Sequence, residues 1–310
     1  MKSIKRLVLV NKYLDRIIKD VSAKKTRLIL PEQNDLRINK AADALSSLGI
    51  EIIDLSDFND TDKYIRHIKN KKFTSNWTDS MLEEYVSNSL NKGLILLDLD
   101  CADCLVAGAV NSSADVIKGS LRIVGLNNEA KWISSCFFMI NPSGLDAYTY
   151  ADCGVIPEPD SNQLVTIAYN AAMTHKLIAK EDPRVAFLSF STNGSAEHYT
   201  IKRVQQAVSS FKNKYPNILC EGEIQFDAAV SPSVAMKKNN NSMLKGEANI
   251  LIFPNLNAAN IAYKITQYLA GYSAWGPLLQ GFRKPVHDLS RGCSVDDIVS
   301  ISLVAALESK

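Results

Sequence analysis

The sequence predicts an α/β fold made of two doubly wound domains with mainly parallel sheets. Short apolar runs typical of strands alternate with longer segments of helical periodicity, which is the pattern of parallel sheets covered by helices. At 310 residues the chain exceeds the usual size of one domain. Hydrophobic residues make up 46% of it and charged residues 22%, the composition of a globular protein with a large core.

Strand and helix patterns already alternate in the first half. Thr26–Leu30 is an apolar run that ends before a proline, and apolar positions at helical spacing follow from Leu36 to Leu48. Ile50–Leu55 is the next predicted strand. Gly93–Leu97 fits either a strand or the end of a helix that begins near Ser80, and the sequence leaves both possibilities open.

The second half continues the alternation. Three runs are β-like, namely Val185–Ser189, Gly222–Gln225 and Asn249–Phe253. The stretches 164–176, 198–212 and 260–269 have helical periodicity, and Lys237–Asn241 is predicted to be a short polar loop.

Charge and hydropathy exclude several classes of protein. A net charge of +2 gives no special attraction to nucleic acid or to a membrane surface. The apolar run Leu7–Val10 is too short for a signal-peptide core, and no segment approaches the length of a membrane span. The glycine motifs of dinucleotide-binding folds and of P-loops are missing. We therefore expect a cytoplasmic protein with no nucleic-acid or membrane partner.

The six cysteines lie mostly in apolar runs, as reduced core thiols do. Cys101 and Cys104 form a CxxC pair, which can bind zinc or carry redox chemistry. Zinc would need a second pair of ligands, however, and the four histidines are scattered. The pattern favours a structural role for these thiols, with no metal site.

The segment from Ser290 to Asp297 is the most informative part of the chain. Ser290-Arg291-Gly292-Cys293 follows a proline-bearing run and precedes an apolar stretch, which predicts a strand, a tight polar turn and a helix. Ser294 is the predicted N-cap, with Asp296 and Asp297 in the first turn. A helix N-terminus beside an arginine and a hydroxyl suits an anion such as phosphate. An ordinary capped helix, whose aspartates complement the helix dipole, explains the same residues.

Six ordered segments, which cover roughly half of the chain, separate these two interpretations. They are Ala151–Pro159, Val185–Ser195, Glu223–Ala229, Ala248–Lys264, Gly276–Gly281 and Ser290–Cys293. Together they closely resemble the phosphotransacetylase (phosphate acetyltransferase) family, part of the wider phosphate acetyl/butyryl transferase group.

This resemblance implies two α/β domains with a cleft between them, and a homodimer built largely through the second domain. It also implies that the C-terminal end returns to the first domain. Residues 1–130 plus 282–310 would then form a shortened first domain, and residues 131–281 the second. The Ser290–Arg291 turn is expected on the cleft wall.

The resemblance further implies a reaction of acetate metabolism, in which an acetyl group passes reversibly between coenzyme A and inorganic phosphate. Acetyl-CoA, acetyl phosphate, coenzyme A and phosphate are the expected small-molecule substrates and products, with no tightly bound cofactor. Asp297 matches the family's base, which takes the thiol proton. Arg291 matches the arginine that stabilises negative charge on the attacked carbonyl and the phosphate. Ser290 matches a residue that orients the thiol or the carbonyl. The resemblance also implies direct transfer in a ternary complex, in which the enzyme acts mainly by positioning the two substrates.

Further substrate-binding residues are expected at two hydroxyl-rich turns. Ser112 and Ser113 match a turn that could hold phosphate, although either serine could simply be an N-cap, a role that Ser113 would serve well. Ser191 and Thr192 follow a predicted strand at the end where α/β sheets bind ligands, although an ordinary polar turn fits them equally well.

The chain departs from the family mainly before about residue 100. A stretch of roughly one βα unit, commonly ~30 residues, is missing near residues 48–54. Lys118 and Tyr268 stand where the family has arginines, and Arg66 and Lys69 are the candidates for a third. Lysine keeps the charge without the bidentate contact, and tyrosine keeps neither.

These departures leave the set of Ser290, Arg291 and Asp297 intact. We therefore expect catalysis with weaker substrate binding or a different acyl preference. Two alternatives stay open. One is a phosphate acyltransferase for a longer chain such as butyryl, and the other is a catalytically weak paralogue that serves as a binding or regulatory subunit.

Overall fold

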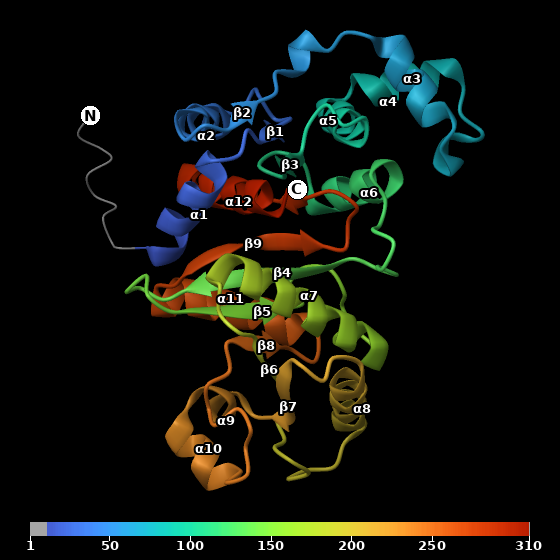
Figure 1. Cartoon of the computed structure of the whole chain (residues 1–310). Helices are drawn as coiled ribbons and strands as arrows, with labels where there is room; N and C mark the ends of the chain where they lie inside the picture. Colours follow the sequence, from blue (N-terminus) through green and yellow to red (C-terminus); the bar gives the residue numbers. More distant parts are fainter. Residues whose placement is uncertain (1–10, 310) are drawn as a thin grey trace. The chain divides into compact units, whose positions relative to one another are not determined.

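The computed structural model describes residues 11–309, which fold into two compact α/β units (Figure 1). The four-stranded unit consists of Leu14–Ile133 and the chain from Gly276 onward. The six-stranded unit consists of Ser134–Trp275 with the described residues up to Tyr13. The predicted fold class, doubly wound α/β with mainly parallel sheets, is confirmed. The apolar run Leu7–Val10 lies outside the described residues.

The sheet of the four-stranded unit is entirely parallel, in the order β10-β3-β1-β2. Its strands are β1 (Arg27–Ile29), β2 (Glu51–Ile52), β3 (Cys104–Ala107) and β10 (Val286–Asp288). The register pairs Asp288 with Ala107, so the ends of β10 and β3 lie side by side although 181 positions separate the two residues in the sequence. The turns that follow these two strands are therefore neighbours.

Helices pack against this sheet in two groups. Helices α2 (Leu36–Ser47) and α12 (Val295–Glu308) contact each other, and α12 contacts β3 and β1. Helix α5 (Ser89–Asp98) packs on β3 and α6 (Ser113–Ile123) on β10. Gly93–Leu97 is thus helical, which settles the ambiguity of that run. Helix α1 (Lys12–Ser22) precedes β1.

The segment between β2 and α5 is short and helical. It contains α3 (Thr61–Lys69), α4 (Asp79–Ser87) and the 3-10 turns Leu55–Asp57 and Lys72–Thr74. The buried carboxylate of Asp98, the last residue of α5, holds it in place. Asp98 accepts from Lys71 Nζ at 2.5 Å and contacts His67 Nε2 at 2.7 Å, and it also pairs with Arg283.

The sheet of the six-stranded unit has the order β7-β6-β8-β5-β4-β9. Its strands are β4 (Ser134–Ile140), β5 (Ala147–Ala151), β6 (Arg184–Leu188), β7 (Leu219–Ile224), β8 (Ile250–Ile252) and β9 (Ser273–Gln280), in which the chain passes between the units. The four strands from β7 to β5 are parallel, whereas β4 is antiparallel to β5.

In the described part of this unit, five helices lie wholly within it: α7 (Ser161–Ala179), α8 (Tyr199–Lys214), α9 (Phe226–Val230), α10 (Pro232–Lys238) and α11 (Leu256–Ala270). The sequence predicted β6, β7, β8, α7, α8 and α11, and the structure confirms them. The predicted loop Lys237–Asn241 is wrong at its start, because α10 continues to Lys238. Strands β4, β5 and β9 were not predicted.

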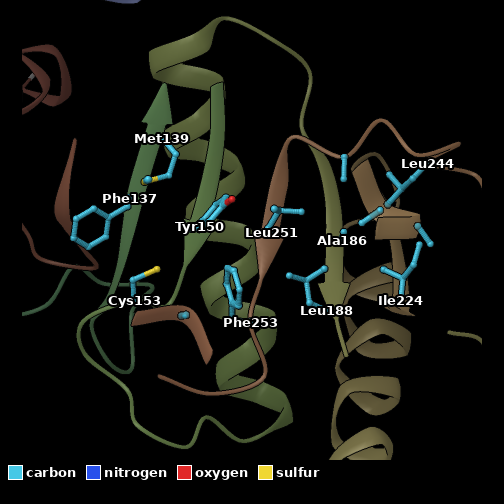
Figure 2. Close-up of a cluster of buried hydrophobic side chains, with 14 of the residues drawn as sticks. Phe137, Met139, Tyr150, Cys153, Ala186, Leu188, Ile224, Leu244, Leu251 and Phe253 are labelled. Carbon is cyan, nitrogen blue, oxygen red and sulfur yellow. The ribbon is translucent and has the colours of Figure 1, made fainter. Parts of the chain in front are cut away.

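Aromatic and aliphatic side chains from neighbouring strands fill the core of the six-stranded unit. Figure 2 shows Phe137 and Met139 of β4, Tyr150 of β5 and Leu251 of β8 in one buried layer. The ring of Tyr263 stacks on Phe137 with centroids 4.0 Å apart, which fixes α11 against β4. One side of α11 therefore packs into this core.

The cysteines are all free, and only Cys101 is not fully buried. No helix within residues 11–309 combines the length and the apolar character needed to cross a bilayer.

Candidate active site

The Ser-Arg-Gly-Cys turn joins β10 to α12, as the sequence predicted. The Cys293 N–H donates to the Ser290 carbonyl at 2.9 Å, and the Gly292 N–H lies 3.3 Å from Ser290 Oγ. The side chains of Ser290 and Arg291 are exposed, and no acid among the described residues pairs with Arg291. The Arg291 guanidinium is thus available to an anion.

Helix α12 begins in a reciprocal capping box that holds the predicted base. Ser294 is the N-cap, as predicted, and its Oγ accepts from the Asp297 N–H at 3.2 Å. Oδ2 of Asp297 in turn accepts from both the backbone N–H and the hydroxyl of Ser294, each at 2.8 Å. Oδ1 of Asp297 has no hydrogen-bond partner within the described residues. The cap therefore orients the carboxylate and leaves one oxygen free.

Arg37 on α2 ties this turn to a second turn. Its Nη1 donates to the carbonyls of Arg291 at 2.8 Å and Cys293 at 3.0 Å, and its Nη2 donates to the Ala109 carbonyl at 2.9 Å. Asp35 holds the same guanidinium through two hydrogen bonds. These bonds lower the pKa of Asp35 to about 2. Arg37 therefore fixes the distance between the two turns.

The second turn joins β3 to α6, and a carboxylate of the chain itself fills it. Oε1 of buried Glu32 accepts from the N–H groups of Val110 at 2.9 Å and Asn111 at 2.7 Å, and from Asn111 Nδ2 at 2.8 Å. Oε2 accepts from the Ala109 N–H at 2.8 Å, and the Gly108 N–H lies 3.1–3.2 Å from both oxygens. Convergent backbone N–H groups of this kind form an anion-binding concavity. Here Glu32 occupies it.

Asp288, the last residue of β10, pairs with Ala107, the last residue of β3, so it lies where both turns begin. It is 1% exposed, and its Oδ1 has no hydrogen-bond partner among residues 11–309. Gly108 has φ +115°, and a Cβ there would lie 2.4 Å from this oxygen, so only glycine permits the approach. Burial raises the pKa of Asp288 to about 6, and the negative charge of nearby Glu32 adds to the rise.

Helix α6 carries three of the predicted substrate-binding residues. Its N-cap is Ser112, whose Oγ accepts from the Asp115 N–H at 3.2 Å. Of the two serines considered for the N-cap, Ser112 is therefore confirmed, and Ser113, which the sequence favoured for that role, is wrong by one position. Ser113, the first residue of α6, is exposed. Lys118 lines a cavity of about 310 Å³ together with Arg122, one helical turn further on.

The two predicted residues of the β6–α8 turn lie in the six-stranded unit and are buried. Ser191 Oγ donates to Glu223 Oε1 at 2.9 Å, and Glu223 also accepts from the Gly194 N–H at 2.7 Å. Thr192 Oγ1 donates to Gln225 Oε1 at 3.3 Å and accepts from the Gln225 N–H at 3.0 Å. Both hydroxyls therefore support the shape of the turn, and a role in substrate binding stays a prediction.

Tyr268 lies on α11, in the same unit. It is 79% exposed and forms an apolar stripe with Ile261, Ile265 and Leu269, which are 52–82% exposed. The spacing of these four residues places them on one side of the helix. Tyr268 thus sits in an unusually apolar surface.

Six of the nine predicted site residues belong to the four-stranded unit. They are Ser112, Ser113, Lys118, Ser290, Arg291 and Asp297. Lys69, a candidate for the third family arginine, pairs with Asp79 on the surface at 2.9 Å. Sequence reasoning missed Glu32, Arg37, Arg122 and Asp288. The dipeptide Pro31-Glu32 directly after a strand was the one local signal for Glu32.

Comparison with known proteins agrees with this geometry. The sequence profile of the phosphate acetyl/butaryl transferase family matches residues 44–306. The phosphate acetyltransferase of Acetivibrio thermocellus is 35% identical over 326 aligned positions, which cover 96% of this chain and 98% of that protein. A phosphotransacetylase structure from Streptococcus pyogenes superposes with a TM-score of 0.89 at 30% identity, covering 96% of this chain and 98% of the other.

The EutD phosphotransacetylase from Staphylococcus aureus has a TM-score of 0.85 at 34% identity, with the same two coverages. A match over more than half of the chain, and identities of 30% or more over nearly all of it, establish the relationship. The chain belongs to the phosphate acetyl/butaryl transferase family.

Proposed function

We propose that this protein is a phosphate acetyltransferase, which transfers an acetyl group reversibly between coenzyme A and inorganic phosphate. The observation that carries the proposal is the β10–α12 turn, where Arg291, exposed and without an acidic partner among the described residues, precedes a capped helix start that orients the carboxylate of Asp297. Acyl transfer between a thiol and phosphate requires these two functional groups, a proton acceptor and a fixed positive charge. The relatives, named phosphate acetyltransferase, support it.

Asp297 is the proposed base. When acetyl phosphate is consumed, the coenzyme thiol must lose its proton before its sulfur attacks the carbonyl carbon. The capping box holds Oδ2 through two hydrogen bonds from Ser294 and leaves Oδ1 to receive that proton. In the opposite direction, the protonated carboxyl returns the proton to the departing thiolate.

Arg291 and Ser290 are the proposed charge-stabilising and orienting groups. Negative charge develops on the attacked carbonyl oxygen while the phosphate remains anionic, and a guanidinium never loses its own charge. Arg37 fixes the turn by donating to the carbonyls of Arg291 and Cys293, so the backbone that carries the Arg291 side chain needs little reorganisation during the reaction. Direct transfer in a ternary complex then needs no acyl-enzyme.

Anionic substrates have further candidate partners on α6. We assign Ser112 and Ser113 to phosphate, and the cavity of Lys118 to the phosphate groups of coenzyme A. Arg122 lines the same cavity and offers the bidentate guanidinium that Lys118 lacks. Ser191, Thr192 and Tyr268 remain proposed as coenzyme contacts of the six-stranded unit. Coenzyme A and acetyl-CoA act as substrates, with no tightly bound cofactor.

We also propose a homodimer that forms through α11. A surface helix normally presents polar residues to solvent, whereas the outer side of α11 is an apolar stripe and the whole helix carries one charged residue, Lys264. A self-complementary neutral stripe suits a second copy of the same chain. Light scattering should give twice the chain mass, and Leu269→Glu should give the monomer mass. A monomeric wild-type protein would refute this arrangement.

A cytoplasmic location follows from the proposed reaction, since free thiols and coenzyme A chemistry belong to a reducing compartment.

Matched variants test the assignment of residues. Arg291→Ala and Asp297→Asn should each lower the turnover number by about a hundredfold or more, the usual loss for one such group. Asp296→Asn removes an exposed acid beside Asp297 and should retain near wild-type turnover. Equal effects of Asp296→Asn and Asp297→Asn would contradict the role of Asp297.

A further inference from the structure

Three aromatic rings lie beside the cavity of Lys118 and Arg122. Phe73 belongs to the 3-10 turn before α4, Trp77 follows that turn, and Tyr85 of α4 lines the cavity. The ring centroids of Phe73 and Trp77 are 5.4 Å apart, those of Trp77 and Tyr85 5.0 Å, and those of Phe73 and Tyr85 5.7 Å. Each ring thus contacts the other two, although all three are only half-buried.

The side chain of Arg122 lies against this aromatic cluster. Its Cζ lies over the Phe73 ring, 5.6 Å from the ring centroid, which is within the range of a cation–π interaction. Arg122 is exposed, and no carboxylate within residues 11–309 forms an ion pair with it. A cation–π contact consumes no N–H group, so it can hold the guanidinium without competing with an anionic ligand.

Lys71, two positions before Phe73, fixes the backbone beside Arg122. Its Nζ donates to the carbonyl of Ile123 at 2.6 Å and to Oδ2 of Asp98 at 2.5 Å. Ile123 is the last residue of α6 and directly follows Arg122, whereas Asp98 is the last residue of α5. Residues of both helices line the cavity. The segment 71–73 therefore holds the end of α6 through Lys71 and the side chain of Arg122 through Phe73.

The charges of the cavity call for an anion. Lys118 and Arg122 are four positions apart on α6, and like charges at that spacing destabilise a helix. The lining contains one acid, Asp115, whose Oδ2 accepts from Ser112 Oγ at 2.6 Å. A multiply charged anion would relieve the repulsion between the two cations. A guanidinium that is already ordered would also lose less conformational entropy when such an anion binds.

We propose that Phe73 is a positioning residue that holds the Arg122 guanidinium in place for the phosphate groups of coenzyme A. Trp77 and Tyr85 support the Phe73 ring in this role. The inference rests on the proposed function, which assigns the cavity to these phosphate groups. Phe73 and Arg122 belong to the cavity and not to the β10–α12 turn, so their contribution is to the binding of the coenzyme and not to the chemical step.

Titration calorimetry with coenzyme A measures this contribution without catalysis. Arg122→Ala removes a charge-assisted contact and should weaken binding about tenfold or more. Phe73→Leu keeps an apolar side chain but removes the ring face, and should weaken binding about three- to tenfold, the usual entropic cost of ordering one long side chain. Phe73→Tyr keeps the ring face and should bind as the wild type does.

Two comparisons distinguish positioning from a general effect on folding. In the Arg122→Ala background, Phe73→Leu should weaken binding no further, because the group that it positions is gone. Phe58→Leu, the same change at another half-buried phenylalanine of this unit, should leave the affinity unchanged.

Turnover assays supply a second readout. S-acetylpantetheine carries the same thioester as acetyl-CoA but no phosphate group. Phe73→Leu should therefore raise KM for acetyl-CoA about three- to tenfold with kcat nearly unchanged, and should leave the rate with S-acetylpantetheine as it is.

The outcomes separate this inference from the proposed function. Wild-type affinity in Phe73→Leu, an equal loss of affinity in the Arg122→Ala background, or an equally slow reaction with S-acetylpantetheine would each overturn the role of Phe73 and leave the function standing. A wild-type protein that binds coenzyme A but releases no thiol from acetyl-CoA with phosphate would overturn the proposed reaction, while the binding series would still decide the role of Phe73. A wild-type protein that does not bind coenzyme A would overturn both.

Discussion

Replacing Glu32 with glutamine tests whether an internal carboxylate holds the β3–α6 turn. The substitution preserves shape and removes the charge. If the amide oxygen takes the place of Oε1, the bonds from Val110 and Asn111 survive in weakened form, because they lose the assistance of the charge. The amide nitrogen then faces the Ala109 N–H, which loses its 2.8 Å bond and meets a second donor.

The magnitude follows from these contacts. A buried donor left without a partner costs about 1–3 kcal/mol, and the weakening of the other charge-assisted bonds adds to this. We expect Glu32→Gln to lower the free energy of unfolding by about 2–4 kcal/mol in urea denaturation. Glu84→Gln, at an exposed position on α4, is the matched control and should change it by less than about 0.5 kcal/mol.

A second variant distinguishes the anion site from general packing. Glu32→Ala should leave the backbone N–H groups converging on an empty site, so formate or acetate in the buffer should raise its thermal midpoint but not that of the wild type. A stability of Glu32→Gln within about 0.5 kcal/mol of wild type would refute the idea that this carboxylate organises the turn.

Three further predictions concern Arg37, Asp288 and His175. Arg37→Lys should lower the turnover number by up to about a hundredfold, because an ammonium group cannot donate to both turns at once. Guanidinium added to the assay should restore part of the activity that Arg37→Ala loses. Full activity of Arg37→Lys would contradict the bridging role. The pKa of Asp288 is raised from 3.8 to about 6, so the folded state binds the extra proton and stability falls as the pH rises from about 4 to 6. Denaturation at several pH values should therefore show Asp288→Asn gaining up to about 3 kcal/mol on the wild type by pH 7, and a constant difference would argue against it. Burial lowers the pKa of His175, a fully buried residue of α7, from 6.5 to about 3, so its contribution to stability is complete above pH 6.5 and is lost as the pH falls. Wild-type stability should drop by about 3 kcal/mol from this source between pH 7 and pH 4.5, and His175→Gln should show a drop smaller by that amount; equal drops would refute the assignment.

Local signals account for what the sequence could predict. Ser294, Asp297 and the turn before them lie within a few residues of one another, so capping preferences were sufficient to identify the helix start. The same reasoning identified β6, β8 and α11, whose apolar runs are bounded by polar turns.

Long-range contacts account for what it could not. The bond from Arg37 to the Arg291 carbonyl joins residues 254 positions apart, and those of Glu32 to the β3–α6 turn span 76–79 positions. Neither leaves a pattern in the sequence. Strand β4 is buried at all seven of its positions, so it has no alternation to reveal it, and β9 contains Gly276-Pro277, which local rules count against a strand.

The proposed activity itself is tested most directly by the release of free thiol from acetyl-CoA by the purified wild-type protein, measured with and without inorganic phosphate. We predict release that requires phosphate and is matched one-to-one by acetyl phosphate, at a rate lost by about a hundredfold or more in Arg291→Ala. Silence with acetyl-CoA in the presence of phosphate would contradict the proposal. Butyryl-CoA in the same assay would then distinguish a preference for a longer acyl chain from a subunit without catalytic activity.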